Sequence, residues 1–203
     1  MSTPRGPLQS GVPFPGRLTV EEDGTFPEQA RGVFAGLLEQ CRATAERIEA
    51  LEAEIVAHVR GDDTARRLAT VPGIGPITAS LITATVGGNI GAFRSARHFA
   101  AWLGLVPRQR STGGKTRLGR ITKAGDREIR TLLVLGATSM VHRAVQWSSA
   151  AGAWVRGLLA RRPVRLVTVA LANKMARIAW ALMTRKEIYR AMGRAAAASA
   201  ATA

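Results

Sequence analysis

The chain has 203 residues, of which 46% are hydrophobic and only 5% aromatic, and its formal net charge is +15. This length allows one medium domain plus an appendage, and an apolar set rich in alanine and leucine favours packed helices. So large a basic excess indicates a polyanionic partner, with nucleic acid first and an anionic membrane surface second. The single cysteine excludes a disulfide framework within one chain and fits a reducing cytosol.

The charge is unevenly distributed along the chain. Residues 1–63 hold 6 Lys or Arg against 11 Asp or Glu, a balance of −5, whereas residues 64–203 hold 23 against 3, a balance of +20. The three late carboxylates are Asp126, Glu128 and Glu187. The second part of the chain is therefore suited to lie against negative charge.

The first predicted elements are a leader and a long helix. Residues 1–27 are rich in Pro, Gly, Ser and Thr and are expected to be disordered. Residues 28–63 are expected to hold an amphipathic helix and a linker, because apolar side chains recur at alternating spacings of three and four: Phe34, Leu37, Cys41, Thr44, Ile48, Leu51 and Ile55. Because this seam is narrow and the outer face is charged, a homo-oligomeric coiled coil is favoured over a helix lying on the domain's own core.

The remainder, residues 64–190, is predicted to be a mainly α domain followed by a flexible tail, 191–203. We expect several short helices over 64–103, a long loop or twisted hairpin over 104–127, and helices over 128–146, 153–161 and 164–186, with a turn around Gly152 and Pro163 opening the last helix. Between Leu68 and Phe93 no residue is charged, but prolines and glycines interrupt the stretch, which argues against a membrane-spanning helix. We also find no secretory signal, and expect a cytoplasmic protein without a membrane partner.

The segment Val71-Pro72-Gly73-Ile74-Gly75-Pro76 resembles the turn of a helix-hairpin-helix motif. In this interpretation Gly73 and Gly75 occupy positive-φ positions, Ile74 is an apolar plug, and free N–H groups at the start of the second helix bind phosphate. Such a site contacts the nucleic-acid backbone and does not select a base sequence. The alternative is an ordinary Gly/Pro turn between packed helices.

The segment VPRQRSTGGKTRLGRITKAGDREIR, residues 106–130, is a basic glycine-rich loop. Its candidate nucleic-acid contacts are Arg108, Arg110, Gly113, Gly114, Lys115, Arg117, Arg120 and Lys123. A nucleotide-binding P-loop is excluded because the Walker A spacing is missing. Two interpretations stay open: a simple binding loop, which the chemistry alone favours, or a loop whose Ser111 attacks phosphorus while arginines stabilise the developing charge.

These two motifs, in this order, resemble the C-terminal domain of the DEDD-type insertion-sequence transposases, a serine-nucleophile family guided by a bridge RNA. The resemblance covers about residues 30–190 and is most specific over 68–137. It implies that Ser111, with Thr112 as the alternative, becomes covalently linked to a DNA end through phosphate. It further implies DNA as a partner, a guide RNA, and a RuvC-like domain whose four acidic residues bind Mg²⁺.

No RuvC-like domain precedes the helix in this sequence, and its acidic tetrad cannot be rebuilt from the carboxylates present. We therefore expect no metal or other cofactor in this chain, and strand transfer only together with a RuvC-like domain. The chain is expected to be a truncated copy that is cytoplasmic and associated with the nucleoid. The alternatives are a catalytically inactive nucleic-acid-binding module and a relic that still folds.

A few further residues have two interpretations each. Arg161, Arg162 and Arg165 cluster where the last helix begins, which suggests a phosphate partner or a solvated charge run. Phe93, Phe99 and Trp102 are expected in the core. Burial is likewise favoured over base stacking for Trp147, Trp154 and Trp180, and the three histidines share no ligand spacing.

Overall fold

The structure is a computed structural model that describes residues 28–112, 115–147 and 149–190. For residues 28–29, 110–112, 115–116 and 145 it describes the backbone alone. The predicted leader, the predicted tail and the candidate contacts Gly113 and Gly114 lie outside the described residues. The chain divides into two compact units, Met1–Leu51 and Glu52–Ala203.

The first unit contains most of the long helix α1, Glu28–Gly61, which confirms the helix expected from the heptad spacing. Its apolar seam is open to solvent, since the exposed large side chains include Phe34 at 41%, Leu37 at 51% and Ile48 at 52%. Apolar area of this extent is unfavourable in water.

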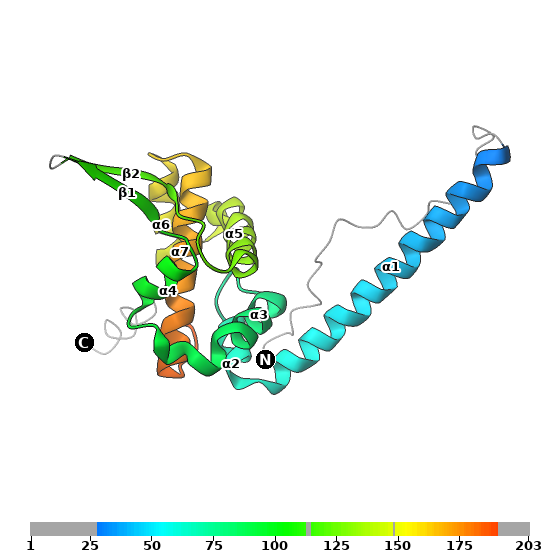
Figure 1. The fold of residues 1–203 in the computed structure, drawn as a ribbon, viewed down its shortest axis with the longest axis horizontal. Helices are drawn as coiled ribbons and strands as arrows, with labels where there is room; N and C mark the ends of the chain where they lie inside the picture. The colour runs from blue at the N-terminus through cyan, green and yellow to red at the C-terminus, as the bar shows by residue number, and fades with distance from the viewer. Residues whose placement is uncertain (1–27, 113–114, 148, 191–203) are drawn as a thin grey trace. The chain divides into compact units, whose positions relative to one another are not determined.

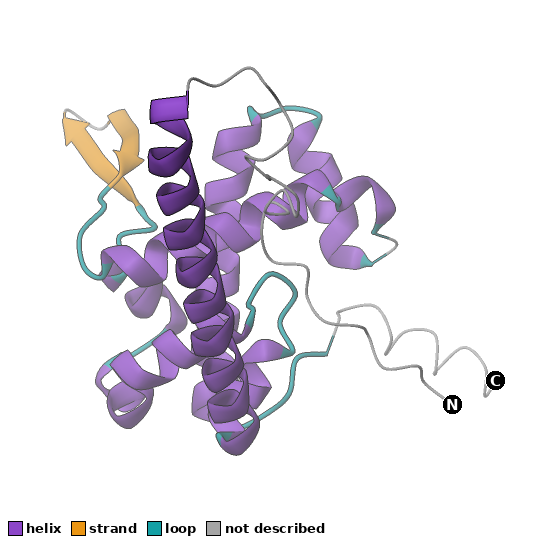
Figure 2. Ribbon diagram, turned by 90° about the vertical axis from the view of Figure 1, so that its right-hand side faces the viewer, coloured by secondary structure: helices purple, strands orange, loops and turns teal. Residues whose placement is uncertain are grey.

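The second unit is mainly helical, as predicted. Its elements are α2 (Asp63–Ala69), α3 (Pro76–Val86), the 3-10 turn η1 (Gly87–Ala92), α4 (Ala96–Trp102), α5 (Arg127–His142), η2 (Ala144–Gln146), α6 (Ala150–Leu159) and α7 (Val164–Arg185), shown in Figure 1. The only strands in the described part of the chain form the antiparallel β1–β2 hairpin, Pro107–Thr112 and Lys115–Ile121, the orange element of Figure 2. The segment left open as a loop or a hairpin is thus a hairpin.

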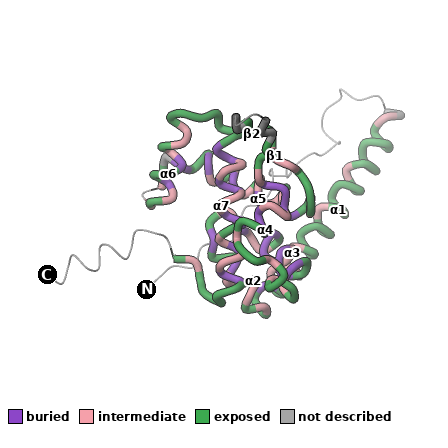
Figure 3. Tube along the Cα trace, turned by 60° about the vertical axis from the view of Figure 1, so that its left-hand side comes forward, coloured by how far each residue is buried: buried purple, intermediate pink, exposed green. Residues whose placement is uncertain are grey.

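Helix α7 is the central element of the core. It is apolar and 22 residues long, and its buried positions recur at helical spacing: Val167, Thr168, Leu171, Ala172, Met175, Ala176, Ala179, Leu182 and Met183. Its length and composition alone would allow it to cross a membrane, but half of its most apolar stretch is buried inside the second unit. Figure 3 shows this burial along α7, with α4 and α5 beside it. The helix is accounted for by its role in the core.

The core prediction is confirmed for Phe99, which is fully buried, while Phe93 and Trp102 are half-buried against the core. The three side chains form an aromatic cluster, in which the ring centroid of Phe93 lies 5.0 Å from that of Phe99 and 5.3 Å from that of Trp102, in edge-on or tilted arrangements. Such geometries suit the quadrupoles of aromatic rings. The cluster fixes the end of α4, from which the chain runs through buried Leu103 and Leu105 directly into β1.

The predicted turn around Gly152 is wrong. Ser149 caps the N-terminus of α6 by accepting a hydrogen bond from the Gly152 N–H at 3.3 Å, so Gly152 lies in the first turn of the helix. A Cβ atom at Gly152 would overlap Trp147. The glycine permits close packing rather than a chain reversal, and composition alone does not separate these two uses of glycine.

Candidate nucleic-acid interface

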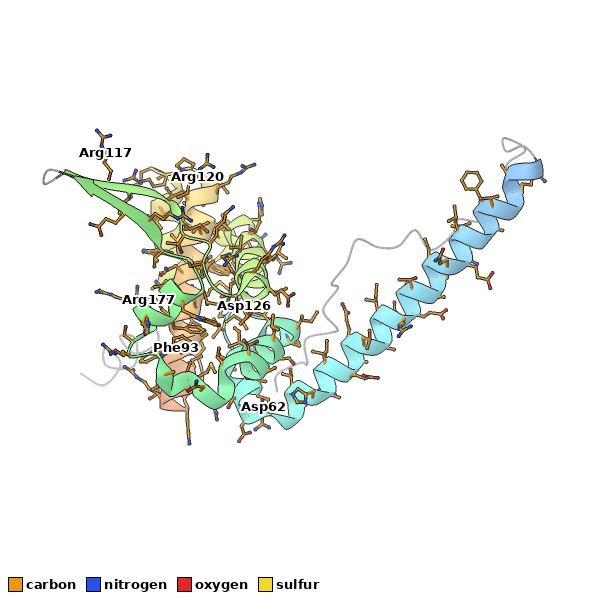
Figure 4. All side chains as sticks on the ribbon, in the orientation of Figure 1. Asp62, Phe93, Arg117, Arg120, Asp126 and Arg177 are labelled. Atoms are coloured by element: carbon orange, nitrogen blue, oxygen red, sulfur yellow. The ribbon has the colours of Figure 1, made fainter. Side chains whose placement is uncertain are left out.

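The β1–β2 hairpin carries most of the predicted contact residues. Arg117 and Arg120 on β2 are exposed, and no carboxylate of the described residues pairs with either of them. Figure 4 labels both residues and shows the Arg117 side chain pointing away from the helices. Leu118 between them is 68% exposed, so this strand presents charge and apolar area together. The arginines are free to bind an anion.

The strand register places cations opposite each other. Arg110 pairs with Arg117 across the hairpin, Ser111 with Thr116, and Thr112 with Lys115. Like charges at directly paired positions destabilise a hairpin. An anion bound beside this pair would offset the repulsion.

The nucleophile candidates are located through their backbone only. Ser111 and Thr112 are the last residues of β1, next to the hairpin tip. The side chains of Arg110, Ser111, Thr112 and Lys115 lie outside the described set, so the structure does not test their roles.

The other two predicted contacts lie where the hairpin joins the helices. Arg108 donates from Nη2 to the carbonyl oxygen of Thr122 at 3.2 Å, so this guanidinium supports the hairpin from within. Lys123 is exposed and has a left-handed φ of 56°, a conformation that costs about 1 kcal/mol for a residue with a side chain. Its N–H donates to the carbonyl of Gly104 at 3.1 Å, which holds the backbone in this conformation.

One arginine anchors the base of the hairpin to α5. Nη1 of Arg130 lies within hydrogen-bond distance of three carbonyl oxygens, those of Leu103 at 3.1 Å, Ala124 at 3.0 Å and Asp126 at 3.3 Å. These carbonyls belong to the segment before β1 and the segment after β2. Arg130 therefore ties both ends of the hairpin to one helix.

A second anchor comes from α7. Asn173 donates from Nδ2 to the carbonyl oxygen of Leu105 at 3.1 Å, across 68 positions of sequence. Between this anchor and the strands, the Thr122 N–H donates to the Val106 carbonyl oxygen at 2.9 Å, which joins the residue before β1 to the residue after β2. The hairpin thus projects from a base that is held by the two helices of the core.

Two glycines allow the two ends of the β1–β2 hairpin to lie close together. Gly104 and Gly125 have φ values of 70° and 73°, and a Cβ atom at either would overlap main-chain atoms, of Ala124 and of Trp102 respectively. Larger residues at these positions would push the two hairpin ends apart.

Asp126 is one of the three late carboxylates. Its carboxylate accepts from the Ile129 N–H at 2.8 Å and caps the N-terminus of α5, while Arg130 bonds only to the Asp126 backbone carbonyl. A carboxylate in this position also interacts favourably with the helix dipole. Asp126 therefore fixes the point at which the hairpin segment becomes helix.

The Pro-Gly turn joins α2 to α3, and Ile74 is buried as predicted. Gly73 has φ of 88°, whereas Gly75 is the N-cap of α3 with φ of −86°, so the positive-φ prediction is right for the first glycine and wrong for the second. Gly73 packs into the core, where a Cβ atom would come within 2.8 Å of Met175 and 2.9 Å of Met140. Gly136 on α5 is equally constrained, since a Cβ atom there would overlap the Gly73 carbonyl.

Phosphate binding at this turn stays a prediction. No side chain caps α3, and Pro76 opens the helix. The role of the turn in packing α2 and α3 against α5 and α7 is established by the contacts of Gly73 and Gly136. Among the described residues, no three His, Cys, Asp or Glu side chains lie close enough to share a metal ion.

The fold and the arginine-rich hairpin define a mainly helical domain suited to polyanion binding, and sequence comparison identifies its class. Residues 65–152 match the family described as Transposase IS116/IS110/IS902 family, so this part of the chain is similar to the transposase domain of that family. The match runs from α2 into α6 and includes the whole hairpin and its anchor on α5.

Individual relatives carry the same designation. The chain is 48% identical over 83% of its length to a probable family 20 transposase of Pseudomonas aeruginosa and 46% identical over 84% to the putative transposase y4pF/y4sB of Sinorhizobium fredii. It is 42% identical over 84% to the transposase for insertion sequence element IS1328 of Yersinia enterocolitica. The aligned parts are 50%, 44% and 51% of these proteins, so the chain spans about half the length of the curated relatives it matches.

Proposed function

We propose that this chain is the DNA-handling part of an insertion-sequence transposase, in which the β1–β2 hairpin contacts the DNA backbone. The observation that carries the proposal is the anchored hairpin itself. It presents Arg117 and Arg120 without carboxylate partners, from a base fixed by Arg130 and Asn173. A rigid cationic projection binds phosphate without first losing conformational freedom.

Within this function we propose that Ser111 is the nucleophile, with Thr112 as the alternative. Ser111 Oγ would attack the phosphorus of a DNA phosphodiester and form a new O–P bond. The bond from phosphorus to one deoxyribose oxygen would break, and that oxygen would leave with the proton given up by the serine. Arginines beside the phosphate would stabilise the charge that develops on its oxygens.

The remaining parts of the proposal follow from the resemblance to the DEDD-type transposases. A RuvC-like domain with four acidic residues would supply the Mg²⁺, and a bridge RNA would select the target. We expect no cofactor in this chain and a cytoplasmic, nucleoid-associated location, without a membrane partner.

The test of catalysis uses the full chain with the RuvC-like half supplied separately from a relative, on a labelled duplex that carries an insertion-sequence end. We expect a covalent protein–DNA adduct that survives denaturing electrophoresis. Ser111→Ala should abolish the adduct and leave DNA affinity within about twofold, whereas the matched variant Thr112→Ala should retain both. The reverse pattern would assign the nucleophile to Thr112.

If neither variant forms less adduct than the wild-type chain, the serine mechanism is wrong. DNA binding with steep salt dependence but without any adduct would favour the alternative, a catalytically inactive nucleic-acid-binding module. Binding that is weak and insensitive to salt would contradict both.

We further propose that α1 pairs with α1 of a second copy. The exposed seam carries this proposal, since Leu37 and Ile48 are each about half exposed. Sedimentation of the full chain should give an oligomer, and Leu37→Glu with Ile48→Glu should give a monomer, because charge in a coiled-coil seam is strongly unfavourable. The control Glu39→Gln with Glu49→Gln, on the charged outer face, should leave the oligomer intact.

A further inference from the structure

A second group of exposed cations lies where α6 meets α7. We call Arg161, Arg162 and Arg165 the α6–α7 arginines. All three are exposed, and in the described part of the chain no carboxylate pairs with any of them. The sequence from Ile129 to Lys186 contains no Asp or Glu at all. The charge of this group is therefore not compensated by neighbouring residues of its own chain.

Neighbouring cations of the same region are engaged in internal contacts. Arg156 donates from Nη1 to the carbonyl oxygens of Ala144, at 2.8 Å, and of Trp147. Lys174 places Nζ 4.4 Å from the ring centroid of Trp154, a cation–π contact that joins α7 to α6. The first contact ties α6 to the η2 segment and the second ties α6 to α7, so the α6–α7 arginines project from helices that are held in place.

The α6–α7 arginines lie at the same end of the second unit as the hairpin. Figure 1 shows the start of α7 and the β1–β2 hairpin at the same height, and Figure 3, turned about the vertical axis, shows α6 and both strands at that end. Arg120 is labelled at this end in Figure 4. The far end of α7, with Arg185 and Lys186, lies about 30 Å away along the helix, because twenty residues rise 1.5 Å each.

We propose that the α6–α7 arginines form a second phosphodiester-binding surface, which contacts the same DNA duplex as the β1–β2 hairpin. The inference rests on the proposed function in one respect, that the hairpin binds DNA. Arginine is suited to this role because its planar group bonds two phosphate oxygens at once. Binding at two separate places on one rigid unit would fix the direction of the duplex relative to Ser111.

An anionic membrane surface is the competing partner for this patch. Val164 and Leu166 beside the arginines are 50% and 51% exposed, and basic residues with apolar neighbours also suit lipid headgroups. DNA is favoured because the hairpin at the same end carries opposed arginines and because the matched family is a transposase family. Membrane binding is therefore an outcome that the experiment has to distinguish.

The expected effect follows from counterion release. Each phosphate contact contributes about −0.9 to the slope of log affinity against log salt, so three contacts contribute about −2.7. When salt is raised fourfold, the wild-type chain should lose roughly 40-fold more affinity than a variant without these three contacts. A change in net charge alone acts over longer distances and is largely screened at 0.15 M salt.

The test measures binding of the full chain to a 30-base-pair DNA duplex by fluorescence anisotropy at several salt concentrations. The variant is Arg161→Gln, Arg162→Gln and Arg165→Gln together. The matched control is Arg185→Gln, Lys186→Gln and Arg190→Gln, which removes the same charge from exposed positions at the far end of α7. Circular dichroism melting verifies that both variants are folded.

We expect the α6–α7 variant to lower the salt slope by 2 to 3 and the control to lower it by less than 1. Equal effects of variant and control would overturn the proposal, because the loss would then reflect net charge alone. Unchanged DNA binding, combined with lost binding to phosphatidylserine vesicles or to a single-stranded RNA, would overturn it in favour of those partners.

A hairpin variant, Arg117→Gln with Arg120→Gln, separates this inference from the proposed function. If the hairpin variant weakens DNA binding and the α6–α7 variant does not, only the further inference fails. If the α6–α7 variant alone weakens binding, the second surface stands and the hairpin contact of the proposed function fails. When both surfaces contact one duplex, the combined variant should show the sum of the two slope changes.

Discussion

Replacing Arg130 with methionine should loosen the hairpin without removing any exposed charge from its strands. Methionine keeps an unbranched apolar stem but donates no hydrogen bond. Nη1 carries two hydrogens, so the three carbonyls within its reach share two hydrogen bonds. At about 1.5 kcal/mol for each bond from a charged donor, we expect a loss of about 3 kcal/mol in the free energy of unfolding.

The measurement is urea unfolding followed by tryptophan fluorescence, with hydrogen exchange to locate the change. Exchange should increase at the N–H groups of Thr122 and Lys123, which close the base of the hairpin. Arg127→Met is the control, because Arg127 is exposed on the same helix and no carbonyl of the described residues accepts from it. Stability within 0.5 kcal/mol of the wild-type value for Arg130→Met would refute the anchoring role.

Four further substitutions, at three positions, test local contacts elsewhere in the second unit. Gly136→Ala should lower stability by at least about 3 kcal/mol in the same urea assay, because the new methyl group overlaps the Gly73 carbonyl, and an unchanged midpoint would contradict this packing. Gly157→Ala, on α6 with nothing within 4 Å of its Cβ position, should instead raise stability by about 0.5–1 kcal/mol, and a loss there would show hidden crowding. Asp126→Ala should cost about 1 kcal/mol by removing the cap bond to the Ile129 N–H, and Asp126→Asn, which keeps the accepting oxygen, should cost less.

The sequence was most informative where apolar residues recur at regular spacing over a long segment. Helices α1 and α7 begin and end within a residue or two of their predicted limits, because the seam of one and the buried face of the other repeat over many turns. The β1–β2 hairpin could be predicted only as one of two options. Its strands, PRQRST and KTRLGRI, have no regular alternation of apolar and polar residues.

The predictions were weakest where the role of a residue depends on distant partners. Arg130 and Asn173 were not singled out, because their acceptors lie as far as 27 and 68 positions away and no local motif marks either residue. Gly152 was misjudged for the same reason, whereas Gly75 is an N-cap with a negative φ and with no atom within 4 Å of its Cβ position. A glycine selected for close packing has the same composition signal as one selected for a positive φ, and only the surrounding atoms separate the two cases.

The shortage of carboxylates explains why the arginines of this domain fall into two groups. With no Asp or Glu between Ile129 and Lys186, backbone carbonyls are the acceptors that remain, and Arg130 and Arg156 each bond to them. These bonds use two of the cations to stabilise the fold. If variants of Arg130 or Arg156 bind DNA less well, the loss could come from a destabilised fold as much as from a lost contact with DNA. Arg117 and Arg120 of the hairpin and the three α6–α7 arginines make no such bond to a carbonyl among the described residues, unlike Arg108. Replacing these exposed arginines with glutamine therefore changes the affinity for DNA without removing a bond that stabilises the fold, so the binding experiments use these positions.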